Sequence, residues 1–397
     1  MKLRLLLLAS LLLTAGLSVV ACGDDQTVDT SGQPPVQVNL LASLSFMAEI
    51  VEPMRRILEE QESFVSMSVE DTTGGPAAGY AIFNKVDRAT RELMIPWTLE
   101  NDAWSSESAA SGRFPDGVLG PPRVLLKVGP LGCSGTGTLD PDIVTWLDLD
   151  GKTLQGGSRP SARDRDSAAA LGINVNHVEH GGDDVTVREL KSGQIDASYY
   201  HMTGHNRPVP QLLQLLQEQD GAFYFVDVAP AVAAIHDKFP GKWPFMFPVP
   251  LYKGDMKGVY NLSVDPIRGD VAHCFGGQNP YFAVSAEMDD AIAYEIVYQT
   301  VKNRADFSRF LAGDVQAITD TLGMTYRPQV DYHPGARAAF EDLDYPYGLA
   351  ATIAYQKQRA EDHGMTFTAP SAFDTLLECT VPSVDCLEME KGVRDIG

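Results

Sequence analysis

The stretch from Gly151 to His201 constrains the fold most, because strand-like and helix-like segments alternate along it. The residue pattern predicts a strand, a Gly/Ser loop, a short helix, a strand, a second helix and a last strand. Strands separated by helices pair in parallel, since each helix carries the chain back over one face of the sheet. This stretch therefore predicts an α/β unit built on a parallel sheet.

The N-terminal part of the chain has the same alternation. Apolar strands are predicted over Val36–Leu41, Phe64–Val69 and Leu93–Trp97, and apolar residues recur at helical spacing over Leu44–Leu58. Pro53 lies inside that helical pattern and is expected to kink the helix or to mark its true start. The order β-α-β-α-β predicts a second parallel sheet with helices on both faces.

Two further apolar strands suggest how these units are connected. Val124–Val128 lies between Gly/Pro clusters, and Tyr281–Val284 precedes a predicted helix over Met288–Asn303. We expect these strands to mark two crossings between two lobes. The expected boundaries are 36–127 for the first part of lobe 1, 128–268 for lobe 2, 269–342 for the return to lobe 1 and 343–397 for a C-terminal extension.

The N-terminus has the pattern of an export signal. Lys2 and Arg4 precede the apolar run Leu5–Ala21, and Val19-Val20-Ala21-Cys22 matches a bacterial lipobox. Residues 1–21 are then a signal peptide, Cys22 receives lipid, and the polar residues 22–35 form a flexible tether. The alternatives are an uncleaved membrane anchor and a plain signal peptide. The apolar run is short for a membrane span, and the small residue before the cysteine favours the lipobox.

The charge of the chain excludes one class of partner. The sequence has 31 Lys and Arg against 53 Asp and Glu, a net charge of −22, which becomes −24 if the signal takes Lys2 and Arg4 with it. Nucleic acid is not an expected partner, because its phosphates need a basic surface. An anionic small molecule is still compatible, since a cleft can be locally positive on an acidic protein.

Four cysteines remain if Cys22 carries lipid, an even number in an oxidising compartment. Cys379 and Cys386 are close in sequence and are expected to form a local disulfide. Cys133 and Cys274 each lie beside an expected crossing, so they either bridge the hinge or are two unrelated buried thiols. A zinc ribbon or thioredoxin-like site is unsupported, because the sequence has no CxxC.

Several separated phrases together resemble the TAXI family of TRAP-transporter receptors, over roughly Val36 to Phe340. In chain order they are Leu147-Asp148-Leu149-Asp150-Gly151-Lys152, the Gly157 to Ser161 loop, Lys191-Ser192-Gly193-Gln194-Ile195-Asp196-Ala197, Tyr252-Lys253-Gly254-Asp255 and His333-Pro334-Gly335-Ala336-Arg337. The sequence departs from the family where Ser161-Ala162-Arg163 replaces Ser-Gly-Thr, and in everything after Asp342. The resemblance implies the α/β, two-lobed periplasmic-binding-protein type II fold with two hinge crossings, here followed by the C-terminal extension.

The resemblance also implies a function. A receptor of this family is a periplasmic, membrane-anchored lipoprotein that binds a small organic anion, an amino acid or a dicarboxylate, between its lobes. It delivers that solute to the membrane subunits of a TRAP transporter, performs no chemistry and needs no cofactor or metal. A second hypothesis keeps the fold but makes the chain a ligand-sensing lipoprotein for a signalling receptor or another transporter.

Candidate ligand-binding residues lie where strands end and helices begin, because helix N-termini favour carboxylates. Three loops qualify. In the third loop, Arg159 or Arg163 can clamp a carboxylate with two hydrogen bonds. The alternative for each arginine is a solvated charge on the loop. The candidates are Ser43 and Ser45 in the first loop, Thr73 and Gly74 in the second, and Gly157, Ser158, Arg159, Ser161 and Arg163 in the third.

Aromatic residues and histidines give further candidates. Tyr199, Tyr200 and His201 follow the Ile195-Asp196-Ala197 strand, where the family's loop lines the cleft, although one of the two tyrosines is expected in the core. Trp104 can form a stacking wall or belong to the core. His201 and His205 have the i,i+4 spacing of a zinc pair, but Gly204 between them favours a loop. The resemblance adds Tyr252 to the candidates.

A periplasmic hydrolase using His201 or His205 is the third hypothesis. Cys133-Ser134 lies between two glycines and superficially suggests a nucleophile, but the G-x-S-x-G elbow is absent from the sequence. His333, in the His-Pro-Gly-Ala phrase, is expected to cap or pack rather than to catalyse. The sequence contains no H-E-x-x-H, P-loop or complete Rossmann fingerprint.

Overall fold

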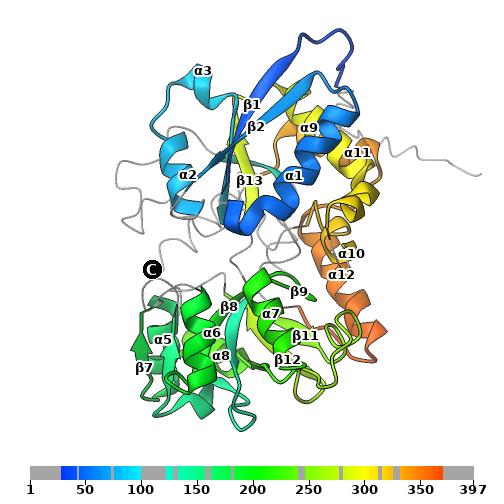
Figure 1. Ribbon diagram of the computed structural model, residues 1–397. Coiled ribbons are helices and arrows are strands. Elements are labelled where there is room, and N and C mark those ends of the chain that lie inside the picture. Colours follow the sequence, from blue (N-terminus) through cyan, green and yellow to red (C-terminus); the bar gives the residue numbers. More distant parts are fainter. Residues whose placement is uncertain are drawn as a thin grey trace, which may run out of the picture.

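The chain forms two α/β lobes, one above the other in Figure 1, each built on its own sheet. The computed structural model describes residues 28–42, 44–72, 76–99, 122–127, 133–156, 162–179, 183–239, 246–276, 280–311, 315–324 and 331–369.

Lobe 1 contains a five-stranded sheet in the order β2-β1-β3-β13-β4. β1, β2 and β3 are parallel, and β13 lies antiparallel between β3 and β4. The strands are β1 (Val36–Ala42), β2 (Val65–Asp71), β3 (Met94–Leu99), β4 (Pro122–Lys127) and β13 (Pro280–Ser285).

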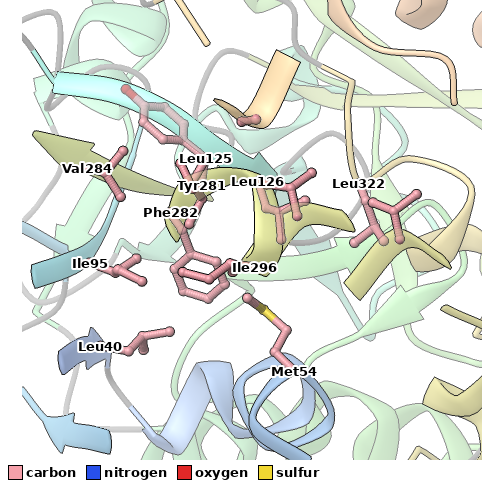
Figure 2. Close-up of a cluster of buried hydrophobic side chains, with 14 of the residues drawn as sticks. Leu40, Met54, Ile95, Leu125, Leu126, Tyr281, Phe282, Val284, Ile296 and Leu322 are labelled. Carbon is pink, nitrogen blue, oxygen red and sulfur yellow. The ribbon is translucent and has the colours of Figure 1, made fainter. Parts of the chain in front are cut away.

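Helices cover this sheet and complete the core of lobe 1. They are α1 (Leu44–Glu60), α2 (Pro76–Phe83), α3 (Arg88–Arg91), α9 (Asp290–Lys302), η2 (Arg304–Arg309), α10 (Gln316–Thr319) and α11 (Pro334–Asp342). Figure 2 shows Met54 of α1 and Ile296 of α9 beside Leu40 and Phe282 of the sheet. α1 begins nine residues before Pro53, so this proline does not mark the helix start, and that alternative was wrong.

Lobe 2 contains an eight-stranded sheet whose main path is β11-β12-β5-β8-β6-β7, with β10 beside β5 and β9 beside β8. The strands are β5 (Cys133–Thr138), β6 (Thr153–Gln155), β7 (Asn176–Val178), β8 (Ala197–Gly204), β9 (Arg207–Pro208), β10 (Tyr224–Val226), β11 (Pro248–Tyr252) and β12 (Val271–Phe275). The helices around it are η1 (Trp146–Leu149), α5 (Ala162–Leu171), α6 (Asp183–Ser192), α7 (Pro210–Glu218) and α8 (Ala229–Lys238).

The two sheets share one plan. In lobe 2, β6 is parallel to β7 and β8, and β5 is antiparallel to β8, just as β13 is antiparallel to β3 in lobe 1. β5 is the first strand after the chain leaves lobe 1, and β13 is the first after it returns. Each crossing thus supplies the antiparallel strand of the lobe that it enters, which confirms the two-lobed fold with two crossings.

The boundary between the lobes differs slightly from the expected one. β12 pairs with β11 along its whole length and with β5 at Phe275. Lobe 2 therefore extends to Phe275 and beyond the expected boundary at 268. The reason is that β12 completes the sheet of lobe 2 before the chain crosses back.

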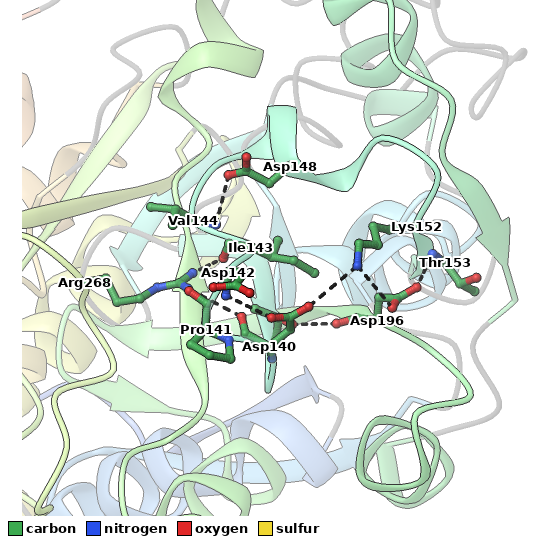
Figure 3. A network of polar contacts seen from close by, with 11 residues as sticks. Asp140, Pro141, Asp142, Ile143, Val144, Asp148, Lys152, Thr153, Asp196 and Arg268 are labelled. Atoms are coloured by element: carbon green, nitrogen blue, oxygen red, sulfur yellow. Dashed lines mark hydrogen bonds and ion pairs between the residues drawn. The ribbon is translucent and has the colours of Figure 1, made fainter.

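A polar network closes the amino ends of β6 and β8 in lobe 2 (Figure 3). The Asp196 carboxylate accepts a hydrogen bond from the backbone N–H of Thr153 at 2.8 Å, and Lys152 Nζ lies 3.9 Å from Asp196 and 3.6 Å from Asp140. Arg268 donates to the carbonyl groups of Pro141 and Ile143. This network joins the starts of the parallel strands β6 and β8. It therefore lies at the edge of the sheet opposite the carboxyl ends of these strands.

The His-Pro-Gly-Ala phrase begins α11. His333 is the N-cap residue, its ring accepts a hydrogen bond from the Gly335 N–H, and Nε2 lies 3.0 Å from the Met288 carbonyl oxygen. A Cβ on Gly335 would lie 2.1 Å from the Asp290 carbonyl oxygen, so only glycine lets α11 approach α9 this closely. The expected capping role of His333 is confirmed.

The start of the C-terminal extension forms α12 (Gly348–Asp362), which runs beside both lobes in Figure 1. Leu349 and Ile353 of this helix belong to the apolar core of lobe 2, although the preceding helix α11 packs on α9 in lobe 1. α12 is therefore part of the fold of lobe 2. Among the described residues, no helix is both long enough and apolar enough to cross a membrane.

Candidate functional site

Three polar residues lie side by side across the sheet of lobe 1 where β3 and β4 end. Tyr281, at the start of β13, is the register partner of both Thr98 and Lys127. Residues directly opposite one another on neighbouring strands point to the same face of the sheet. We call Thr98, Tyr281 and Lys127 the lobe-1 row. All three are buried, and Lys127 is only 2% exposed.

Lobe 2 has a matching arrangement, the lobe-2 row. Ser134, in β5, is the register partner of Phe275 at the end of β12 and of His201 near the end of β8. β8 also contacts α10 of lobe 1, so the row lies close to the boundary between the lobes. Both rows are at the carboxyl ends of parallel strands, where ligands of open α/β sheets bind.

The two crossings connect these rows directly. The first leads from Lys127 to Ser134, and the second from Phe275 to Tyr281. At about 3.5 Å of reach per residue, the first can span at most roughly 25 Å and the second roughly 20 Å. These lengths limit the distance between the two rows, each of which lies at the carboxyl edge of its own sheet.

Arg163 lies beside the lobe-2 row, in the first turn of α5. Its Nη1 donates a hydrogen bond of 2.7 Å to Ser134 Oγ, while Nε and Nη2 donate to Asp164 Oδ1 at 3.0 and 2.9 Å. The guanidinium lies over the rings of Phe275 and Tyr199, at 4.2 and 5.3 Å from their centroids. Arg163 and Asp164 are 3% and 2% exposed, so this is a buried ion pair with aromatic walls.

Tyr199 and His201 complete this cluster from the same face of β8. Their rings meet edge to face at 4.5 Å, and Tyr199 Oη lies 3.3 Å from His201 Nδ1. Burial raises the pKa of Tyr199, an effect that the Arg163 charge and a hydrogen bond with Ser134 partly offset. The tyrosine is thus a neutral hydroxyl that can donate or accept a hydrogen bond.

Lobe 1 also has buried hydroxyl groups close to its row. Thr98, in the row, and Thr72, which follows β2, are 0% and 4% exposed. Within the described part of the chain, neither Oγ1 atom has a hydrogen-bond partner. An unsatisfied buried hydroxyl is costly, so these two groups are suited to a polar ligand.

The structure places Tyr200 and Arg163. Tyr200 points to the opposite face from Tyr199 and lies in the lobe-2 core between Phe223 and Phe225, as expected for one of the two tyrosines. Gly135 makes room for it, because a Cβ there would lie 2.4 Å from the tyrosine ring. Arg163 was expected to clamp a carboxylate, and its Nε and Nη2 donate to the Asp164 carboxylate.

Tyr252 lies at the end of β11, beside α12. Its ring stacks on His363 at 4.8 Å and lies 5.1 Å from the Arg359 guanidinium, so the end of α12 covers it. His205, the other half of the suggested zinc pair, has its Nδ1 3.3 Å from Tyr355 Oη of the same helix. Among the described residues, no group of three or more His, Cys, Asp or Glu side chains could hold a metal ion.

The remaining candidates lie outside the described residues or have side chains outside them. Ser45 is in the first turn of α1, but its side chain is not described. The others are Ser43, Thr73, Gly74, Trp104, Gly157, Ser158, Arg159 and Ser161, together with Cys22, Cys379 and Cys386.

Four of the residues in the rows carry no functional signal in the sequence. Lys127 ends an apolar strand, and Thr98, Tyr281 and Phe275 lie in or beside other apolar strands, where they resemble core residues. Ser134 stands out only as a doubtful nucleophile. A lysine at the end of an otherwise apolar strand is the one available clue, because lysine is almost never fully buried without a partner.

Cys274 is buried in β12, where its Sγ lies 3.5 Å from the Val249 carbonyl oxygen. Cys133 is the first residue of β5, which lies next to β12, but its side chain is not described. The pairing of Cys133 with Cys274 therefore remains a prediction.

A hollow of about 500 Å³ lies at the opposite end of the lobe-1 sheet, near the starts of β1 and β3. It is lined by Gln37, Asn39, Ser68, Thr90 and neighbouring apolar residues. Its position at the amino ends of the strands separates it from the two rows, so we do not assign the site there.

No family model and no curated protein matches the chain. Among solved structures, it is similar to one described as a periplasmic transporter, with 13% identity, a TM-score of 0.45, and coverage of 81% of this chain and 97% of the other. It is also similar to the periplasmic binding protein BugD, with 10% identity, a TM-score of 0.41, and coverage of 84% of this chain and 99% of the other. The values for MatC of Rhodopseudomonas palustris with bound malate are 10% identity, a TM-score of 0.43, and coverage of 80% and 99%. The function is therefore inferred from this chain's own residues.

Proposed function

We propose that this protein is an extracytoplasmic solute receptor that binds a small organic anion between its two rows and delivers it to a membrane transporter. The observation that carries the proposal is the placement of two buried cations, Lys127 and Arg163, at the facing carboxyl edges of two sheets. The crossings hold these edges within about 25 Å of each other.

The chemistry of the rows favours a carboxylate. The Lys127 ammonium can attract a carboxylate, and the lobe-1 row adds the hydroxyls of Thr98 and Tyr281. A carboxylate held there can accept hydrogen bonds from the Lys127 ammonium group and from the neutral hydroxyls. An amino acid or a dicarboxylate would present a second polar end to Ser134 and Tyr199 in lobe 2.

The acidic surface does not oppose this binding. The chain carries a net charge of −22, whereas the inner ends of both sheets present basic groups. A site can be locally positive on an acidic protein, so the overall charge does not exclude an anionic solute.

The hydrolase hypothesis is less well supported. Ser134 and His201 are register partners, an arrangement that would suit a nucleophile and its base. However, Ser134 Oγ accepts a hydrogen bond from Arg163, which withdraws electron density from the oxygen, and His201 Nδ1 lies against Tyr199. A nucleophilic serine needs a base as its partner instead.

The transporter class and the anchoring are proposed on the sequence alone. The phrases that resemble the TAXI family favour a TRAP transporter, and the lipobox ending at Cys22 favours a lipid anchor in the periplasm. A signalling lipoprotein of the same fold is the second candidate. Co-purification with TRAP membrane subunits encoded by neighbouring genes would separate the two.

Replacement of Lys127 tests the proposal. Calorimetry with succinate, L-glutamate and related anions identifies a binding probe, and Lys127→Met should weaken that probe's binding about a hundredfold or more, because a buried charge partner is lost. The control is Lys85→Met, which removes an exposed lysine from the same lobe. Unchanged affinity in folded Lys127→Met protein, or binding of none of these anions by the wild type, would contradict the proposal.

A further inference from the structure

The C-terminal extension makes a third connection between the lobes, and it is the shortest of the three. Tyr345 belongs to the core of lobe 1, where its hydroxyl donates to the Thr319 carbonyl at 2.6 Å and accepts from the Leu322 N–H at 3.0 Å. Leu349, only four residues later, belongs to the core of lobe 2. Four residues span at most about 14 Å.

Residues 322–324 link this connection to the end of β4. The Lys127 N–H donates to the Leu322 carbonyl at 2.8 Å, and the Gly348 N–H donates to the Gly323 carbonyl at 2.8 Å. Met324 and Gly348 form an isolated parallel bridge. A Cβ on Gly323 would lie 2.7 Å from Tyr347 Cβ, so the two segments are in tight contact.

Beyond the connection, α12 is fixed to lobe 2 by a buried ion pair. Arg359 Nη2 donates to Asp255 Oδ2 at 2.7 Å, and the same oxygen accepts from the Tyr252 N–H at 2.7 Å. The second carboxylate oxygen of Asp255 lies 3.3 Å from His363 Nε2. Arg359 and Asp255 are 7% and 8% exposed, so solvent screens the pair little.

We propose that residues 345–363 act as a strap that is fixed to lobe 1 at Tyr345, moves with lobe 2 from Leu349 onward, and limits the orientations that the two lobes can adopt. The pivot is Pro346-Tyr347-Gly348, since these residues lie between Tyr345 of lobe 1 and Leu349 of lobe 2, and Gly348 has φ +79, a conformation that favours glycine. This inference rests on the proposed function only in taking the lobes to move when a solute binds.

Added length at the pivot is the direct test. Six Gly/Ser residues inserted between Tyr347 and Gly348 should leave α12 docked but release the restraint, so the ligand-free protein should show a larger radius of gyration by small-angle scattering. The control carries the same insertion after Gly172, in an exposed turn within lobe 2 that also has positive φ. Hydrogen exchange of α12 checks that docking is retained.

A second variant loosens the other end of the strap. Arg359→Leu should accelerate amide exchange in α12 about a hundredfold, because it leaves Asp255 buried without its partner, and should enlarge the radius of gyration in the same way. The matched control is Arg309→Leu, which removes an exposed ion pair with Glu60 in lobe 1.

An unchanged radius of gyration in both strap variants would overturn the proposal, provided that the insertion variant keeps α12 protected. Expansion of the Gly172 control by as much as the pivot variant would also overturn it. Because these measurements use ligand-free protein, their results do not depend on which solute the protein binds. Failure of every carboxylate to bind would therefore reject the proposed function without deciding the strap.

Discussion

The two rows differ in how each lobe supports its cation. In lobe 2, Arg163 is held by Asp164, by Ser134 and by two aromatic rings, so its direction is fixed. In lobe 1, Lys127 comes from the last position of a strand and reaches its neighbours through a four-carbon stem. Since guanidinium is a rigid planar donor and ammonium a compact point charge, we infer that lobe 2 orients the solute and lobe 1 supplies the charge.

The largest expected effect concerns stability in lobe 2. Arg163→Leu should lower the free energy of unfolding by about 3–5 kcal/mol, because it leaves the Asp164 carboxylate buried and unpaired. Arg163→Leu with Asp164→Leu should recover much of this loss, since two apolar residues can replace a buried ion pair. Urea denaturation of the two single variants and the double variant measures the coupling. A double variant destabilised by the sum of the two single losses would show that the pair is not coupled and would remove the contrast between the lobes.

A smaller effect compares one buried histidine from each lobe. Burial lowers the pKa of His333 in lobe 1, and it lowers the pKa of His205 in lobe 2 further, helped by the charges of Arg359 and His363. Both pKa values are depressed in the folded state, so each histidine contributes stability above its unfolded pKa of about 6.5, and that stability is lost as pH falls through the folded pKa.

The free energy of unfolding should therefore decrease between pH 7.5 and pH 5. His205→Gln should reduce this decrease more than His333→Asn, which keeps a good N-cap residue for α11. Denaturant titrations across this range measure both slopes. Equal slopes in the two variants would mean that the acid sensitivity does not distinguish the lobes.

The smallest effect separates two neighbouring residues of one strand. Tyr199→Phe should weaken solute binding about threefold to tenfold, the worth of one hydrogen bond, since its hydroxyl faces the cluster around Arg163. Tyr200→Phe should leave binding unchanged and should not destabilise the fold, because the buried Tyr200 hydroxyl has no hydrogen-bond partner within the described part of the chain. Calorimetry measures the first and thermal unfolding the second. If Tyr200→Phe affected binding more than Tyr199→Phe, the assignment of the two strand faces would be wrong.

The sequence was sufficient to predict the fold because the phrases that resemble the family have structural roles. Asp196 closes the start of β6 through the Thr153 N–H, His333 caps α11, and Asp255 accepts from the Tyr252 N–H in its own turn. Caps and turns act on nearby backbone, so a short phrase reveals them. These three roles say little about the ligand, because they concern the backbone rather than the two rows.

The site was harder to predict because it is assembled across strands. Lys127, Tyr281 and Thr98 are far apart in sequence and become neighbours only through the insertion of β13 between β3 and β4. Loops that open helices can be found by local pattern, and Arg163 was found in this way. Its partner Ser134 was not, since strand register is a long-range property that no local pattern reports.

The insertion of each crossing strand into the middle of a sheet has a consequence for the order in which the chain folds during its synthesis. The sheet of lobe 1 lacks β13, between β3 and β4, until residues 280–285 have been made, and the core of lobe 2 lacks α12 until later still. Neither half can therefore fold to completion on the ribosome ahead of the other, as consecutive domains usually do. If residues 1–21 direct export, this delay keeps the emerging polypeptide loose enough to thread through a membrane before it compacts.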